Sequence, residues 1–239
     1  MSFCAFLTAS SGNMLSLVEI DRLSARVGDI ARAATRLRGA ILHAPTILPS
    51  NDPFLQTEIP PACVLQLYFG DIDALEDALT ASGAAGAVVN DPALSGCTWT
   101  QQAMAVRTFA VPAPCKPVSG ERREAFTYLV AYDGHAVDNN AWLSQYIRQH
   151  PPIMTQLPAV REVEVCSRVD YCSSLDIPRA TAIQRNKVVF DSASALAQSL
   201  ASPVRHALRR DFESLPRFEG VTPHYPMRSL AHDLAAEFV

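Results

Sequence analysis

The chain has 239 residues, of which 49% are hydrophobic and 18% charged, and its formal net charge is −4. This composition is typical of a folded globular protein, and the length suits one large domain or two of about 120 residues. The negative charge offers no basic surface for nucleic acid, and no apolar run reaches the roughly 18 residues needed to cross a bilayer. The N-terminus lacks the basic start of a secretory signal. We therefore expect a cytoplasmic protein without nucleic-acid or membrane partners, in which six cysteines without a CxxC pair are reduced thiols rather than metal ligands.

The first half of the chain alternates between strand and helix patterns. Apolar runs typical of strands cover residues 2–8, 40–48, 62–69 and 98–109. Apolar residues at three- and four-residue spacing predict helices over residues 18–37 and 71–81. Asp71 suits the N-cap of the second helix, and the proline-rich residues 49–61 predict a loop. Strand, helix, strand, strand, helix, strand is the order of the ferredoxin-like fold, whose helices cover one face of the sheet.

The second half repeats this order after a linker at residues 111–123, which is rich in proline and charge. We expect one unit over residues 1–110 and another over 124–239. The predicted strands of the second unit cover residues 125–132, 160–166, 187–190 and 221–229. The predicted helices cover residues 139–150 and 192–202, the first ended by Pro151 and Pro152. A second helical turn is predicted after the 192–202 helix, up to Asp211.

An offset of 121 residues relates similar positions in the two halves. It pairs Phe69 with Phe190, Ala74 with Ala195, Leu75 with Leu196 and Leu79 with Leu200. We therefore predict an α+β fold in which two ferredoxin-like βαββαβ repeats pack sheet to sheet as an α+β barrel within one chain. Such a chain is its own pseudo-dimer, and two chains could associate further into a homodimer of pseudo-dimers.

Three short motifs in the second half resemble the EthD-type proteins of the dimeric α+β barrel superfamily. They are YIRQHPPI at residues 146–153, VVFDSASAL at 188–196 and RRDFESLP at 209–216. In that family a His-Pro pair ends the first helix and an Asp-Phe pair precedes the last strand, which matches His150-Pro151 and Asp211-Phe212. The first half has Asp29 and Asn90 at the equivalent positions, so we interpret it as a structural partner without a site.

The resemblance implies a pocket between sheet and helices that takes a small, apolar or aromatic organic molecule. It implies an enzyme of oxygenase, isomerase, cyclase or lyase type without a cofactor, with haem bound through a histidine as the alternative. A second alternative is a non-catalytic ligand-binding or assembly module with the same barrel. Nucleotide-binding, hydrolase and zinc-protease motifs such as GxGxxG, GxSxG and HExxH are absent from the sequence.

The predicted catalytic residues are His150, His224 and Glu162. His150 shares a helix face with Tyr146 and could act as a general base, or it could be a core histidine bonded to a carbonyl. His224 could project into the same cavity, although Pro223 and Pro226 also suit an exposed edge strand.

Alternation over residues 160–166 predicts that Glu162 and Glu164 line the barrel interior, unless they form the solvated side of an edge strand. We expect further substrate-binding side chains, which are Tyr128, Tyr132, Tyr146, Glu164, Asp211 and Arg228. Aromatic core packing is the alternative for Tyr128 and Tyr132, and for Asp211 it is a structural role in the turn before the last strand.

Overall fold

The computed structural model describes residues 2–48, 59–114 and 122–233. The first half contains β1 (Ser2–Ser10), α1 (Leu17–Ala33), β2 (Leu37–Pro45), β3 (Cys63–Phe69), α2 (Ile72–Ala78), α3 (Ala84–Val89) and β4 (Thr98–Phe109). The second half contains β5 (Arg122–Ala136), α4 (Asn139–Met154), β6 (Val160–Arg168), β7 (Gln184–Phe190), α5 (Ala193–Leu200), α6 (Pro203–Ser214), β8 (Phe218–Val221) and β9 (His224–Asp233).

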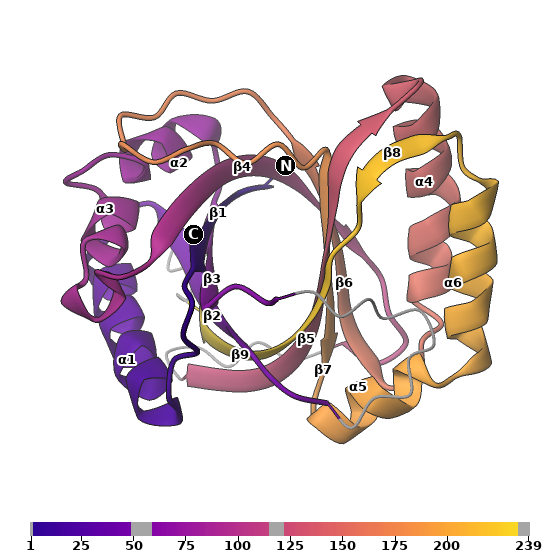
Figure 1. The fold of residues 1–239 in the computed structure, drawn as a ribbon, viewed down its shortest axis with the longest axis horizontal. Helices are drawn as coiled ribbons and strands as arrows, with labels where there is room; N and C mark the ends of the chain where they lie inside the picture. The colour runs from indigo at the N-terminus through magenta and orange to yellow at the C-terminus, as the bar shows by residue number, and fades with distance from the viewer. Residues whose placement is uncertain (1, 49–58, 115–121, 234–239) are drawn as a thin grey trace, which may run out of the picture.

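Eight of these antiparallel strands close into a barrel, with the helices on its outside (Figure 1). The first half supplies four strands in the order β4-β1-β3-β2, and the second half supplies β9-β5-β7-β6. The two sets are hydrogen-bonded to each other along both edges, through β2–β9 and β4–β6. The prediction of a barrel with helices outside is confirmed. The bare faces of both sheets look inward, as predicted, and side chains of both halves pack together between them. The sheets also join edge to edge, which the sequence did not predict.

Helices flank the barrel on two opposite sides (Figure 1). Helices α1, α2 and α3 cover the strands of the first half, while α4, α5 and α6 cover those of the second. Apolar side chains fill each of these two layers, and a third apolar cluster, which includes Phe6, Met104 and Met227, lies inside the barrel. The barrel is therefore a packed core at its centre, not an open channel.

Local sequence signals fix several helix starts where we expected them. Asp71, Asp138 and Ser192 each cap a helix by accepting a hydrogen bond from the backbone N–H three residues later. In the described residues, no helix is long and apolar enough to span a membrane.

Several boundaries differ from the predicted ones. Helix α1 ends at Ala33 rather than at residue 37, and Arg36 follows with a φ of 72°, a conformation that starts the turn into β2. Helix α4 continues through Pro151 and Pro152 to Met154, which is buried. The avoidance of helix before proline is a preference, and burial of the last turn of α4 outweighs it.

Sequence reasoning missed α3 and β8, and it predicted only a helical turn where the structure has the whole helix α6. Most of the predicted loop at residues 49–61 and of the linker at 111–123 lies outside the described residues.

Candidate functional site

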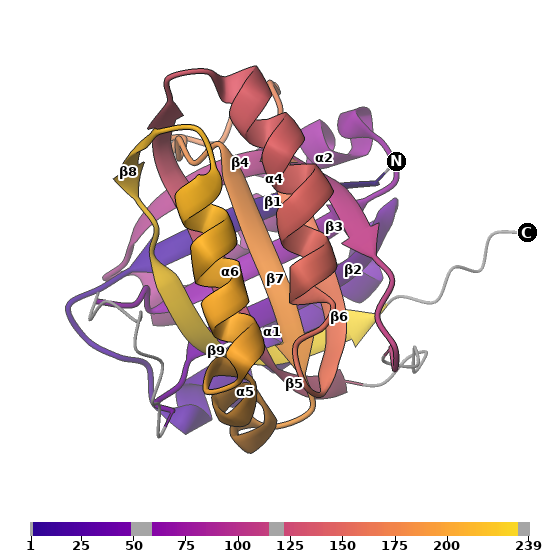
Figure 2. The same ribbon diagram turned by 90° about the vertical axis from the view of Figure 1, so that its right-hand side faces the viewer.

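The candidate site lies between α4, α6 and the sheet of the second half (Figure 2). His150 of α4 and Asp211 of α6 meet there, with the imidazole Nδ1 2.8 Å from the carboxylate Oδ2. The exposed fractions of the two side chains are 8% and 10%, so the pair is largely shielded from solvent. A carboxylate bonded to Nδ1 orients the imidazole and leaves Nε2 for proton transfer, the arrangement of a general base with its orienting group.

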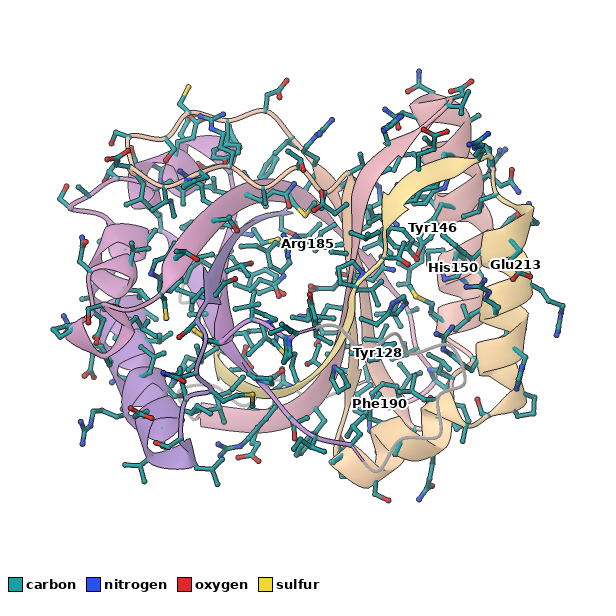
Figure 3. All side chains as sticks on the ribbon, in the orientation of Figure 1. Tyr128, Tyr146, His150, Arg185, Phe190 and Glu213 are labelled. Atoms are coloured by element: carbon teal, nitrogen blue, oxygen red, sulfur yellow. The ribbon has the colours of Figure 1, made fainter. Side chains whose placement is uncertain are left out.

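The helical repeat explains why His150 faces the sheet. Trp142, Tyr146 and His150 follow one another at intervals of four residues on one face of α4, and all three are buried. Figure 3 shows Tyr146 and His150 between the barrel wall and the outer helices. Asp211 reaches this layer from the middle of α6, which corrects the expectation that it lies in a turn before the last strand.

Two tyrosine hydroxyls and an amide form a hydrogen-bonded chain next to the imidazole. Asn186 Nδ2 donates to Tyr146 Oη at 2.6 Å, and the hydroxyls of Tyr146 and Tyr132 are 3.1 Å apart. Burial raises the pKa of Tyr132 to about 12 and raises the pKa of Tyr146 well above its ordinary value, so both phenols keep their protons. Because Tyr146 accepts from Asn186, its own hydrogen can go to Tyr132, and Tyr132 can then donate to a bound molecule.

A cavity of about 50 Å³ opens beside His150 and is lined by Tyr132, Arg205, Phe212 and His224 among others. A second cavity of about 40 Å³ also touches His150, Tyr132, Arg205 and His224. The structure thus places His224 and Tyr132 on the same cavities as His150, where the sequence analysis had grouped them as site residues.

Burial governs the protonation of His150. Removal from water lowers the pKa of His150, and the cation of Arg205 lowers it further, while the hydrogen bond and charge of Asp211 act in the opposite direction. The pKa of His150 lies below its ordinary value as a result, so the neutral imidazole, which can accept a proton, is the dominant form at neutral pH.

Arg205 is a site residue that sequence reasoning missed. It is 8% exposed and lies near the start of α6, a helix whose Ser202-Pro203 beginning is a recognisable start signal. Identifying α6 from that signal would have brought Arg205 and Asp211 to the same helix.

The predicted carboxylates lie on the other side of the sheet. Val163 and Val165 of β6 pack beneath the helices, so the alternating Glu162 and Glu164 point into the barrel. There, both bind the ammonium group of Lys187, at 2.7 Å and 3.0 Å. Their predicted position inside the barrel is confirmed, but the predicted grouping of Glu162 with His150 is corrected, because a β-sheet separates the two.

Of the remaining predicted residues, Tyr128 lies at the candidate site and Arg228 does not. Tyr128 is buried on the helix side of β5, with its ring centre 5.4 Å from that of His224. Arg228 lies elsewhere, in ion pairs with Asp21 of α1 and Glu124 of β5 at 3.4 Å and 2.8 Å. Arg228 therefore connects the two halves on the outside of the barrel.

The residues around His150 do not fit haem. The cavity of about 50 Å³ is far below the ~300 Å³ at which pockets for drug-sized ligands begin, and a porphyrin is larger still. The Tyr146 ring also lies 4.5 Å from the imidazole, centre to centre. Among the described residues, no group of three or more His, Cys, Asp or Glu side chains could hold a metal ion.

Together, the closed eight-stranded barrel and the outer helices define an α+β barrel protein with an Asp–His pair beneath one helical layer. No protein-family model matches the sequence, and no curated protein does. Solved structures do match over nearly the whole chain. An anthrone oxidase-like protein covers 100% of this chain and 95% of its own, with 12% identity and a TM-score of 0.62.

Two further structures extend this comparison. A candidate monooxygenase from Fusobacterium nucleatum subsp. nucleatum covers 97% of this chain and 94% of its own, with 6% identity and a TM-score of 0.57. Another from Lactobacillus acidophilus NCFM covers 97% and 96%, with 7% identity and a TM-score of 0.54. An EthD family protein from Bacillus halodurans also matches, over 40% of this chain and 94% of its own, with 16% identity and a TM-score of 0.32. The chain shares the α+β barrel fold of the first three structures, so the predicted resemblance is confirmed at the level of fold.

Proposed function

We propose that the protein is an enzyme that abstracts a proton from a small organic molecule in the cavity beside His150, without an organic cofactor. The observation that carries this proposal is the buried His150–Asp211 pair at 2.8 Å on a cavity lined by further polar side chains. Proton abstraction is a first step common to cofactor-free oxygenases, isomerases, cyclases and lyases, so the proposal leaves the overall reaction among these classes.

Each polar side chain has a role in this mechanism. Asp211 holds Nδ1 of His150, and Nε2 takes the proton from the substrate. The substrate then becomes an anion, and the buried guanidinium of Arg205 stabilises that charge in a setting of low dielectric constant. The Tyr132 hydroxyl donates a hydrogen bond to the same anion, and His224, which lines the same cavity, helps to orient the substrate.

The size of the cavity restricts the substrate. A molecule of few atoms fits the described conformation, whereas an aromatic substrate requires side chains of α6, such as Leu208 and Phe212, to move away from the sheet. The similar structures described as anthrone oxidase-like and as candidate monooxygenases support a small-molecule enzyme on this fold. Their identities of 12% and 6% leave the reaction itself to experiment.

The proposal is tested by incubating the purified full-length protein with anthrone and a panel of phenols and enolisable ketones. Product formation is followed by absorbance and liquid chromatography with mass spectrometry. We expect His150→Ala to reduce turnover by about 10²- to 10⁴-fold, the usual contribution of general acid–base catalysis. His206→Ala, the same change on the exposed part of α6, is the matched control and should leave turnover unchanged. Turnover that survives His150→Ala would remove the imidazole from the mechanism.

The alternative function, a non-catalytic ligand-binding or assembly module, is favoured by one observation. The cavities at His150 are small, and the centre of the barrel is packed with side chains. Native mass spectrometry of protein purified from its own host distinguishes the two functions. An unmodified small-molecule adduct with no turnover of any tested compound supports the binding module.

We also propose that the two halves are tandem ferredoxin-like repeats, 1–110 and 124–239, of which the second carries the site. The support is the order of strands, which is equivalent in β4-β1-β3-β2 and β9-β5-β7-β6. The further association of two chains stays a prediction, which sedimentation velocity would test.

A further inference from the structure

One end of the barrel holds a cavity that the proposed mechanism does not use. It measures about 270 Å³, much larger than the cavities at His150, and we call it the barrel-mouth cavity. Its floor is made by Tyr68, Glu162, Glu164 and Lys187, and its rim includes Arg38 and other side chains. Because these floor side chains point into the barrel, the cavity is separated by the sheet from His150.

The floor is an ion cluster in which the ammonium group has no donor to spare. Lys187 Nζ lies 2.7 Å from Glu162 Oε1, 3.0 Å from Glu164 Oε2 and 2.7 Å from Tyr68 Oη. Tyr68 Oη in turn donates to Glu164 Oε2 at 2.7 Å. An ammonium group has three hydrogens, so Lys187 can bind nothing further. A ligand in this cavity must therefore be recognised at the rim.

The rim carries two arginines, Arg38 and Arg123. Arg123 forms an ion pair with Asp233, with 3.8 Å between Nε and Oδ2. In the described parts of the chain, the Arg38 guanidinium forms no hydrogen bond or ion pair. Burial raises the pKa of Glu164, and both floor carboxyl groups already bind the Lys187 ammonium. The floor groups therefore bind one another, and the exposed Arg38 guanidinium is the charged group at the rim that a ligand can reach.

A glycine places one of these cations. The guanidinium of Arg38 lies against Gly70 at the end of β3, so close that a Cβ there would be 2.2 Å from Arg38 Nη2. A glycine in this position lets the flat guanidinium pack against the backbone at the mouth of the barrel. Apolar atoms of Ala40 and Ile41 complete the wall beside it.

We propose that the barrel-mouth cavity binds a small organic carboxylate, with its charged group between the guanidinium groups of Arg38 and Arg123 and its apolar body against Ile41 and Tyr68. Guanidinium groups are well suited to carboxylates because their N–H groups match the two oxygens. A volume of about 270 Å³ accepts a body the size of a benzene ring. This site is independent of the proposed reaction at His150.

Isothermal titration calorimetry on the full chain with three ligands of the same shape tests the charge preference. Benzoate is the probe, benzamide is its neutral counterpart and benzylamine its cationic one. We expect benzoate to bind at least tenfold more tightly than either of the others. Equal binding of benzamide, tighter binding of benzylamine or no binding of benzoate would each overturn the proposal.

Variants locate the site. Arg38→Gln and Arg123→Gln should each weaken benzoate binding about tenfold, and Gly70→Ala should weaken it without a change of charge, because the added methyl displaces the Arg38 guanidinium. Arg26→Gln removes an exposed arginine of α1 and is the matched control, with no expected effect. His150→Ala should also leave benzoate binding unchanged. Loss of binding in His150→Ala would place the acid beneath the helices instead and refute the barrel-mouth site, whereas failure of the proposed reaction would leave this result untouched.

Discussion

Glu162 and Glu164 lie two residues apart on β6 and both bind Lys187, yet we expect replacement by glutamine to affect stability very differently at the two positions. Burial alone would raise the pKa of Glu162, but the charge and hydrogen bond of Lys187 outweigh it and lower the pKa to about 2. At Glu164 burial prevails and raises the pKa. The folded protein therefore stabilises the ionised form of Glu162 but not that of Glu164.

These pKa shifts set the magnitude of each effect. A fall of the Glu162 pKa from 4.5 to about 2 corresponds to about 3 kcal/mol of stabilisation at neutral pH. Because the folded-state pKa is the lower one, this stabilisation is complete above pH ~4.5 and is lost as the pH falls toward 2. Glutamine at position 162 removes the charge, so Glu162→Gln should lower the free energy of unfolding by about 3 kcal/mol at pH 7. Because the pKa of Glu164 is raised, ionisation of Glu164 does not stabilise the folded protein, so Glu164→Gln should cost less than Glu162→Gln.

Urea unfolding followed by circular dichroism at pH 7 and pH 4 measures both effects, with the m-value as a check that the unfolding reaction is unchanged. The difference between wild type and Glu162→Gln should narrow at the lower pH. Glu213→Gln is the control, since Glu213 makes an exposed pair with Arg209 on α6 (Figure 3) and should cost less than ~0.5 kcal/mol. Equal costs at positions 162 and 164, or a larger cost at 164, would refute the opposite directions of the two pKa shifts.

Two other predictions follow from the geometry. In wild type the imidazole of His150 should titrate below its ordinary pKa of 6.5. Asp211→Asn should lower that pKa further, because the carboxylate opposes the effect of burial. NMR titration of the imidazole C–H signals measures both pKa values, and a higher pKa in the variant would contradict the assigned contact. Gly134→Ala should destabilise the protein by about 3 kcal/mol in thermal unfolding, since Gly134 has a φ of 154° and a Cβ would meet the Glu219 carbonyl oxygen at 2.2 Å. Gly12→Ala, where a Cβ meets nothing within 4 Å, is the control, and an equal effect at both glycines would contradict this reasoning.

Helix α6 shows what local patterns contain and what they leave out. Val204, Leu208, Phe212 and Leu215 recur at intervals of four and three residues, so the spacing does indicate a helix with an apolar inward face. The same spacing does not indicate that this face packs beside α4. That inward face is what supplies Asp211 to His150.

The buried lysine illustrates the same limit in a strand. Lys187 is buried in the middle of β7, directly opposite Glu164 in the register of β6 and β7. The residues before it in the strand, Gln184, Arg185 and Asn186, are polar, so the local sequence does not mark Lys187 as buried. Its partner depends on which strand lies alongside and in which register. His43 is similar, because its buried contacts with Gln66 and Ser229 join β2 to β3 and β9.

The sequence by itself determined the features that depend on neighbours along the chain. Alternation on β6 put Glu162 and Glu164 on one face, four-residue spacing put Tyr146 and His150 on another, and capping residues fixed where helices begin. Only the tertiary structure decided which of these faces share a space. Closure of the ring through β2–β9 and β4–β6 turned the glutamates into the barrel, while helix packing kept His150 outside it. Those pairings join residues more than 50 positions apart, so they follow from burial of the whole sheet and not from any local pattern.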